Sequence, residues 1–334
     1  MSTTRKKIIN YIGSFPPPYG GVTIKNELLL KHLKNDFDVK RFKGKNRFLM
    51  ALWITKCVFS KSPLIIGVSS KKKKSLFITR ILYIFNKKLM SRSLYFMMGG
   101  TESSRISNNK KELKMYSFYK RIFVEMDEMK QMMISAGLSN VSIYPNCRER
   151  AEFEKKEHNG FKALFFSQIS YMKGADILLE VAKTNKKIQF VFYGEIDESF
   201  KNEFFTALEE LQNVTYMGVY KGSGSALYDL LSSYDVLIFP TRWKSEGIPG
   251  VLVEAKLSGL PAIVSDVSFN SKLINDMVDG IVLKKNDYVH LESALIQLVN
   301  NRFFLSTLGK NAKLSSDKYV VSNYINKIVD LLNS

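Results

Sequence analysis

The sequence predicts an α/β protein with two doubly wound, Rossmann-like domains. Short apolar runs recur along the whole chain of 334 residues, and each is followed by a loop and then by a helical pattern. Apolar residues make up 45% of the chain, which is enough for two full cores. No apolar run approaches the roughly 18 residues that a membrane-spanning helix needs. Because doubly wound sheets bind ligands at the carboxyl ends of their strands, site residues are expected in the loops that follow the strands.

The first half opens with a strand, a glycine loop and a helix. The strand is expected at Ile8–Ile12, the loop ends in Gly20 and Gly21, and the helix covers Val22–Leu33. The loop matches neither G-x-G-x-x-G nor a P-loop, so no dinucleotide fingerprint is present. Further strands of this half are expected at Pro63–Val68, Ser93–Met98, Arg121–Glu125 and Val141–Tyr144.

Residues 43–92 combine basic and apolar side chains. Residues 1–150 hold 30 Lys and Arg against 9 Asp and Glu, whereas residues 151–334 hold 20 against 22. An amphipathic helix is expected over Ser75–Met90, with its apolar face on the domain core, next to the lysine run Lys71–Lys74. The charge indicates contact with an anionic surface, either phospholipid or nucleic acid, and the alternative is a solvated lysine-rich face. No motif supports nucleic acid.

The second half repeats the strand–helix rhythm after a charged segment at residues 147–160, which is typical of a domain boundary. The predicted domains are therefore residues 1–150 and 151–314, followed by a C-terminal helix within 315–334. Strands of the second half are expected at Ala163–Ser167, Ile188–Tyr193, Val214–Met217, Asp235–Phe239, Ala262–Val264 and Gly280–Leu283.

The stretch from Asp235 to Val264 forms the most informative strand–loop–helix–strand unit. Its helix begins near Gly250, and the first N–H groups of a helix, here those of Gly250 and Val251, form an anion site. Glu246 precedes the helix and Glu254 lies two turns into it. The pieces suit a phosphate on the helix end and hydroxyl groups on the two carboxylates, as in a nucleotide sugar.

The segment from Glu246 to Glu254, followed by Gly259-Leu-Pro261, resembles the E-x7-E signature of family 4 retaining glycosyltransferases. The resemblance implies the GT-B fold, in which a cleft separates two Rossmann-like domains. It also implies that Glu246 contacts the donor sugar, that Glu254 binds the ribose and that the backbone between them holds the diphosphate. The alternative is a helix with two surface carboxylates.

The loop from Ser167 to Gly174 resembles the family's G-R-x4-K-G loop, whose Arg and Lys bind the donor diphosphate. Lys173 matches this pattern, but Gln168 stands where the family has arginine. Glutamine lacks the bidentate charge of arginine, so Arg242 is a candidate to supply it.

Three further positions are carried over from the family. Gly20 and Gly21 resemble the Pro/Gly-Gly loop that faces the donor phosphates and the acceptor. Val219, after Gly218, matches the segment near the nucleotide base.

The resemblance thus implies a retaining glycosyltransferase that moves a sugar from a nucleotide-sugar, with UDP favoured, to a hydroxyl of a glycan or lipid-linked glycan. Glu246 and Lys173 are the predicted catalytic residues. The expected pathway is bacterial capsule or O-antigen assembly. The basic first domain is expected to contact anionic membrane, and no nucleic acid partner is expected.

No metal or cofactor is expected besides the donor. Cys57 and Cys147 are far apart and the three histidines are isolated, so no metal-ligand spacing occurs. The first residues lead into a strand without the apolar region of a signal peptide, which favours the cytoplasm, with a peripheral position at the inner face of the membrane.

Three other interpretations stay open. A non-catalytic GT-B-like partner subunit is supported by Gln168 in place of arginine. A nucleic-acid-binding protein is supported by the net charge of +19 alone. A sugar epimerase of the same fold would use the same nucleotide-sugar cleft.

Overall fold

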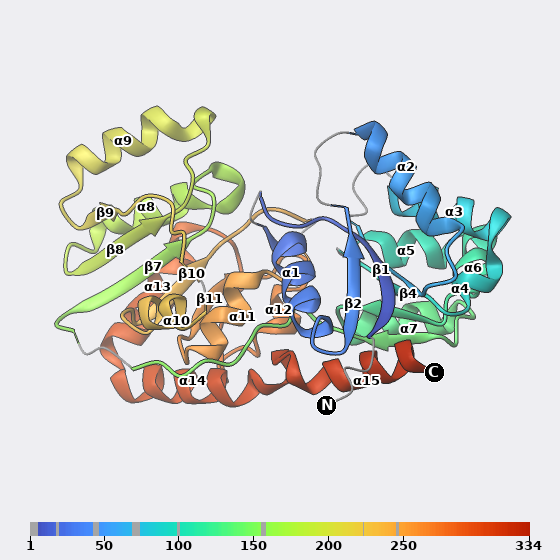
Figure 1. Cartoon of the computed structure of the whole chain (residues 1–334). Coiled ribbons are helices and arrows are strands. Elements are labelled where there is room, and N and C mark those ends of the chain that lie inside the picture. The colour runs from blue at the N-terminus through green and yellow to red at the C-terminus, as the bar shows by residue number, and fades with distance from the viewer. Residues whose placement is uncertain are drawn as a thin grey trace, which may run out of the picture. The chain divides into compact units, whose positions relative to one another are not determined.

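The computed structural model describes residues 6–17, 20–42, 47–68, 74–98, 101–154, 158–222, 224–244 and 247–334. The chain divides into two compact units, whose elements are labelled in Figure 1. Unit 1 comprises Met1–Arg148 and Val320–Ser334, and unit 2 comprises Glu149–Tyr319. Each unit holds one parallel six-stranded sheet, which confirms the predicted α/β class with two doubly wound domains.

The sheet of unit 1 has the strand order β2-β1-β3-β4-β5-β6. From β1 the chain goes to one side of the sheet, toward β2, and from β3 it goes to the other side, so the strand order reverses between β1 and β3. The inner strands β3 and β4 are short apolar runs, as expected for strands buried on both faces, whereas the edge strand β2 is partly exposed. The strands are β1 (Lys7–Gly13), β2 (Phe37–Arg41), β3 (Leu64–Gly67), β4 (Leu94–Phe96), β5 (Arg121–Val124) and β6 (Val141–Ile143).

Two helices from opposite ends of the chain contribute to one core of unit 1. The first is α1 (Gly21–Leu33), which buries Leu29, and the second is α15 (Ser322–Asn333), which buries Ile328. Both side chains belong to a cluster that also contains sheet residues. In addition, Lys7 Nζ donates to the carbonyl of Leu332 at 2.6 Å. The last helix of the chain therefore packs on unit 1.

The remaining helices of unit 1 enclose a buried polar cluster around Glu102, whose Oε1 accepts hydrogen bonds from Ser75 Oγ at 2.7 Å and Tyr95 Oη at 2.9 Å. Arg105 donates to the same oxygen at 2.9 Å. This carboxylate thereby ties two helices, those of Ser75 and of Glu102 itself, to the strand that carries Tyr95. The remaining helices of the unit are α2 (Arg47–Val58), α3 (Lys74–Phe85), α4 (Lys87–Met90), α5 (Thr101–Ser107), α6 (Lys110–Tyr116) and α7 (Asp127–Ser135).

The helix predicted over Ser75–Met90 was wrong in two respects. It is two helices, α3 and α4, because Asn86 caps the second one: its side chain accepts a hydrogen bond from the Leu89 N–H at 2.9 Å. Its apolar side chains also do not all reach the core. Leu82 is buried, but Phe85 is 62% exposed. Of the adjoining lysine run, Lys71–Lys73 lies outside the described residues.

The sheet of unit 2 has the order β12-β11-β10-β7-β8-β9. The chain passes from β7 to β8 and β9 on one side and from β10 to β11 and β12 on the other. Two of these strands, β8 and β12, have the predicted bounds. The strands are β7 (Phe161–Phe166), β8 (Ile188–Tyr193), β9 (Val214–Tyr216), β10 (Val236–Phe239), β11 (Ala262–Ser265) and β12 (Gly280–Leu283).

Helices of unit 2 follow each strand and pack through apolar faces, as α8 does with Leu178 and Val181, both fully buried in the largest core cluster. This periodic burial is why the α/β rhythm is legible in the sequence. The helical segments are η2 (Tyr171–Lys173), α8 (Ala175–Thr184), η3 (Glu198–Phe200), α9 (Lys201–Glu210), α10 (Ser225–Leu231), α11 (Gly250–Leu257), α12 (Asn270–Leu273), α13 (Tyr288–Asn300), α14 (Arg302–Ser315) and η4 (Asp317–Tyr319).

Candidate functional site

The reversal of strand order in unit 2 lies between β7 and β10, which are hydrogen-bonded neighbours. The loops that leave their carboxyl ends run in opposite directions, and such a switch point is where open α/β sheets bind ligands. Gln168 and Lys173 lie on the loop after β7, and Arg242 lies on the loop after β10. The structure therefore brings together three residues that the sequence predicted as a site.

The two loops touch at a glycine. Gly174 has φ +77°, and a Cβ on it would lie 2.2 Å from the carbonyl oxygen of Pro240. No side chain fits in that space, and the left-handed backbone also favours glycine. Gly174 is thus needed for the backbone of one loop to approach the other.

Arg242 joins the same two loops through its side chain. Its guanidinium makes a bidentate pair with Asp176, the two N–O distances being 2.7 and 2.8 Å, and it also donates to the carbonyl of Tyr171. The Arg242 backbone N–H donates to the Met172 carbonyl at 2.8 Å. The hydrogen bonds to Asp176 raise the pKa of Arg242. A diphosphate would have to compete with Asp176 for this guanidinium.

Lys173 ends the short helix η2. Ser170 caps that helix by accepting a hydrogen bond from the Lys173 N–H at 3.3 Å. The Lys173 ammonium lies 5.7 Å from the ring centroid of Phe239, the last residue of β10. The half-buried side chain therefore reaches across the switch point from β7 toward β10.

Gln168 points toward the other neighbour of β7. Its Nε2 donates to Asp197 Oδ2 at 3.2 Å, in the loop after β8. Next to it, Gly194 has φ +147°, and a Cβ there would lie 1.8 Å from the Ser167 carbonyl oxygen. The loops after β7 and β8 are therefore also in close backbone contact.

The beginning of the loop after β10 is also held by hydrogen bonds from β11 and from the segment that follows β12. Ser265 Oγ donates to the Thr241 carbonyl at 2.6 Å, and Asn286 Nδ2 donates to the Pro240 carbonyl at 2.9 Å. Further along this loop, Glu246 lies outside the described residues, so its predicted role stays a prediction. The described part of the loop is fixed by β7, β11 and β12 together.

Helix α11 follows this loop and places three predicted residues. Pro249 is its N-cap with φ −65°, and Gly250 and Val251 are its first helical residues. The N–H groups of a first helical turn have no acceptor within the helix and attract anions. Glu254 lies one turn further and is half-buried. The helix thus presents an anion-binding end, with a carboxylate behind it.

A buried ion pair anchors α11 to the segment just before β12. Lys256 Nζ lies 2.7 Å from Asp279 Oδ2, both side chains being 1% exposed, and Lys256 also donates to the Leu273 carbonyl at 2.9 Å. Asp279 accepts further bonds from Asn275 and Ser315. Burial lowers the pKa of Lys256, and Asp279 opposes this shift. Sequence reasoning missed this pair, although a lysine inside an apolar helix was a signal.

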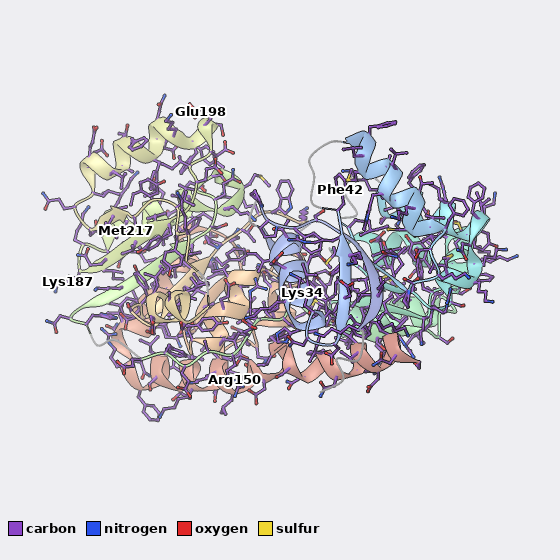
Figure 2. The ribbon with its side chains drawn as sticks, in the orientation of Figure 1. Lys34, Phe42, Arg150, Lys187, Glu198 and Met217 are labelled. Carbon is purple, nitrogen blue, oxygen red and sulfur yellow. The ribbon has the colours of Figure 1, made fainter. Side chains whose placement is uncertain are left out.

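Val219 lies at the edge of the sheet, on the loop after β9, and is 54% exposed, as is its neighbour Met217, labelled in Figure 2. Three aromatic rings gather at the carboxyl ends of β7 and β8 and on this loop. The ring centroids of Phe166, Tyr193 and Tyr220 are 5.5 to 6.1 Å apart. The sequence analysis did not identify these rings as candidate contacts of the base. They are far apart in the sequence and are brought together by the pairing of the strands.

In unit 1, Gly20 and Gly21 follow β1, at the reversal of strand order in that sheet. Gly20 has φ −174°, which any residue can adopt, and a Cβ on it would meet none of the described residues within 4 Å. A Cβ on Gly21 would lie 3.9 Å from Asn146, the one described residue within that distance. The fold of the described residues does not require these glycines.

No group of three or more His, Cys, Asp or Glu side chains is placed to hold a metal among the described residues. Within the same residues, no helix has the length and apolar character to cross a bilayer. Cys57 and Cys147 are both buried and free of disulfides, and burial raises the pKa of each thiol to about 12. Such thiols are unreactive at neutral pH.

Residues 148–315 match the family described as Glycosyl transferases group 1. The matched segment is half of the chain and contains the whole sheet of unit 2 with its switch point.

Two curated relatives come from Escherichia coli. O-antigen chain mannosyltransferase C is 24% identical over 212 residues, which cover 61% of this chain and 56% of the relative. UDP-Gal:alpha-D-GlcNAc-diphosphoundecaprenol alpha-1,3-galactosyltransferase is 30% identical over 104 residues, which cover 31% of this chain and 26% of the relative. The match therefore spans between about a quarter and little more than half of the length of these relatives.

Among solved structures, HepE from Anabaena, in complex with UDP and glucose, aligns with a TM-score of 0.73. The alignment covers 99% of this chain and 100% of HepE at 15% identity. At this identity the likeness concerns the fold, and it confirms the predicted GT-B fold.

Proposed function

Because the chain belongs to the group 1 glycosyl transferases, we propose that it moves a sugar from a UDP-sugar to a hydroxyl of a lipid-linked glycan, with retention of anomeric configuration. The observation that carries this proposal is the switch point of unit 2. There Lys173 and the first turn of α11 bring positive charge and N–H groups to one edge of the sheet. The UDP complex of HepE supports the choice of nucleotide.

In the proposed reaction the diphosphate is the leaving group. Negative charge grows on it as the glycosidic bond breaks, and Lys173 with the N–H groups of Gly250 and Val251 stabilises that charge. Gln168 contributes a neutral hydrogen bond where the resembling family has an arginine. The leaving phosphate takes the proton of the acceptor hydroxyl, so that no side-chain base and no metal is required.

The remaining donor groups are assigned to three regions. Glu254 binds the ribose hydroxyls, and Glu246 orients the transferred sugar. Val219 and the ring of Tyr220 contact the base, since an aromatic face at the edge of a polar loop suits stacking. Gly20 and Gly21 leave space for phosphate or acceptor, which is supported by the lack of any described residue within 4 Å of a Cβ built on Gly20.

The proposed acceptor is a polyprenyl-diphosphate-linked sugar in bacterial capsule or O-antigen assembly. One relative is named for a GlcNAc-diphosphoundecaprenol acceptor and another for O-antigen chains. A lipid-linked acceptor places the enzyme at the cytoplasmic face of the membrane. The excess of basic residues in the first half supports peripheral contact with anionic lipid there.

One observation favours a second candidate, a non-catalytic partner of a glycosyltransferase. Gln168 and Arg242, two residues assigned to the diphosphate, are both bonded to carboxylates, those of Asp197 and Asp176. This candidate predicts that no UDP-sugar is consumed.

The test is transfer from radiolabelled UDP-sugars to a polyprenyl-diphosphate-GlcNAc acceptor, with the anomeric configuration of the product read by NMR. Lys173→Ala is expected to lower the rate by about 100- to 1,000-fold, as loss of one transition-state donor does elsewhere. The matched control is Lys183→Ala, which removes an exposed lysine of α8 that pairs with Glu180 of the same helix. An equal rate in both variants, or an inverted product, would contradict the proposal.

A further inference from the structure

Helices α2 and α3 carry apolar side chains that the core of unit 1 does not cover. Seven large ones, including Phe59 directly after α2, are between 52% and 70% exposed. We call them the α2–α3 surface, and they are Phe48, Leu49, Leu52, Phe59, Phe77, Ile84 and Phe85. The two helices lie side by side in Figure 1, and the rings of Phe59 and Phe85 are 6.2 Å apart. The exposed side chains therefore form one continuous surface rather than scattered positions.

The spacing of these residues follows the helical repeat. On α3, Phe77, Arg80 and Ile84 are three to four residues apart and all are exposed, so they lie on one side of the helix. Exposed aromatic and aliphatic side chains together with cations are the residue types of helices that lie in a membrane interface.

The fold itself does not need the outer stripe. The inner side of α3 is fixed by Ser75 on Glu102 and by Thr79 on Tyr119, at 2.7 and 2.9 Å. Among the described side chains of α2, the two that are buried are Cys57 and Val58. Apolar side chains that remain exposed at a cost in solubility indicate a partner that covers them.

The charge around this surface selects the partner. Residues 39–101 contain 15 Lys and Arg and no Asp or Glu. A pocket of about 490 Å³ is lined by three of these cations, Lys40, Arg41 and Lys56, together with Trp53 and with Asp38, whose Oδ2 lies 2.8 Å from Lys40 Nζ. Phe42, labelled beside α2 in Figure 2, contacts the ring of Trp53 at 6.3 Å. A partner must therefore offer negative charge and an apolar interior at the same place.

We propose that the α2–α3 surface docks on an anionic lipid bilayer, with its aromatic and aliphatic side chains at the boundary between headgroups and acyl chains. The described cations among residues 39–101 then lie at headgroup level. This inference rests on the lipid-linked acceptor proposed above and names the surface that meets the lipid. Nucleic acid offers the charge but gives Leu52 and Ile84 nothing apolar to pack against.

The test is sedimentation of the full chain with phosphatidylcholine vesicles, with and without phosphatidylglycerol. Wild type is expected to bind the anionic vesicles, and the double variant Phe48→Gln/Phe77→Gln to bind at least about tenfold more weakly. Both side chains are at least 64% exposed, so the variant is expected to fold. The matched control is Phe303→Gln, which changes an 84% exposed phenylalanine on α14 of unit 2 and should bind like wild type.

Two further measurements separate the outcomes. Brominated lipids should quench the fluorescence of Trp53 on α2, and Trp53→Phe should remove that quenching. The inference would be overturned if the double variant and wild type bound the vesicles equally. It would also be overturned if wild type bound RNA or DNA and the double variant kept that binding. A wild-type dimer that the double variant converts to a monomer would overturn it as well. UDP binding by the same samples reports on the donor site separately, so its failure and the failure of docking are distinguishable.

Discussion

Helices α2 and α10 have the same place in their units but opposite relations to solvent. Each follows the edge strand on one side of the switch point and leads back to a strand at that point, α2 from β2 to β3 and α10 from β9 to β10. Helix α10 buries Leu227, Tyr228 and Leu231. Helix α2 is longer and richer in apolar residues, yet it leaves Phe48 and Leu52 more than half exposed.

This difference shows that the number of apolar residues in a crossover helix does not by itself tell how many of them are buried in the core. In unit 2, α10 turns its large apolar side chains to the core, and the loops at the switch point are tied together at Gly174 and Arg242. In unit 1 the inner sides of α2 and α3 complete the core, and the outer sides remain for a partner. Unit 2 is thus braced around the proposed donor site, and unit 1 presents the α2–α3 surface.

The largest expected effect concerns the buried pair of α11. Lys256→Met should lower the free energy of unfolding by about 3–5 kcal/mol, because Asp279 is left as an unpaired buried charge. Urea denaturation measures this. The double variant Lys256→Met/Asp279→Asn removes the charge and should lose less than Lys256→Met alone. If the single variant loses less than the double, the pair does not anchor the helix.

A matched pair of leucines tests the comparison of the two helices directly. Leu231→Ala in α10 removes a fully buried side chain and should cost about 2–5 kcal/mol of unfolding free energy. Leu52→Ala in α2 removes a side chain that is 52% exposed and should change stability by no more than about 0.5 kcal/mol. Equal losses in thermal or urea unfolding would mean that α2 serves the core as α10 does.

A matched pair of glycines separates fold from ligand. Gly174→Ala should cost at least about 1–3 kcal/mol, because alanine is strained at φ +77° and its Cβ collides with Pro240. Gly20→Ala should leave the melting temperature unchanged and lower transfer activity, because its Cβ enters space that a ligand is proposed to fill. An unstable Gly20→Ala variant would show that this loop is needed by the fold instead.

The sequence was sufficient for the fold class and for the loops that carry the candidate residues, and insufficient for the contacts between those loops. Strands such as Ile188–Tyr193 were predictable because continuous apolar runs end at turn residues. The pairing of Arg242 with Asp176 was not, since it joins two loops through strand order that the sequence does not encode locally. The exposure of Phe85 was missed for the same reason: periodicity identifies a stripe, but not whether anything covers it.

The measurement that tests the central claim most directly is a thermal unfolding screen of wild type and Glu254→Ala with UDP, GDP, ADP and their sugars. A ligand of the native state raises the unfolding free energy by about 2.7 kcal/mol at a hundredfold excess over its dissociation constant. The account predicts a shift with UDP or a UDP-sugar that Glu254→Ala loses and the control Glu180→Ala, an exposed residue of α8, retains. No shift with any nucleotide, or a shift that Glu254→Ala keeps, would contradict a donor site at the switch point of unit 2.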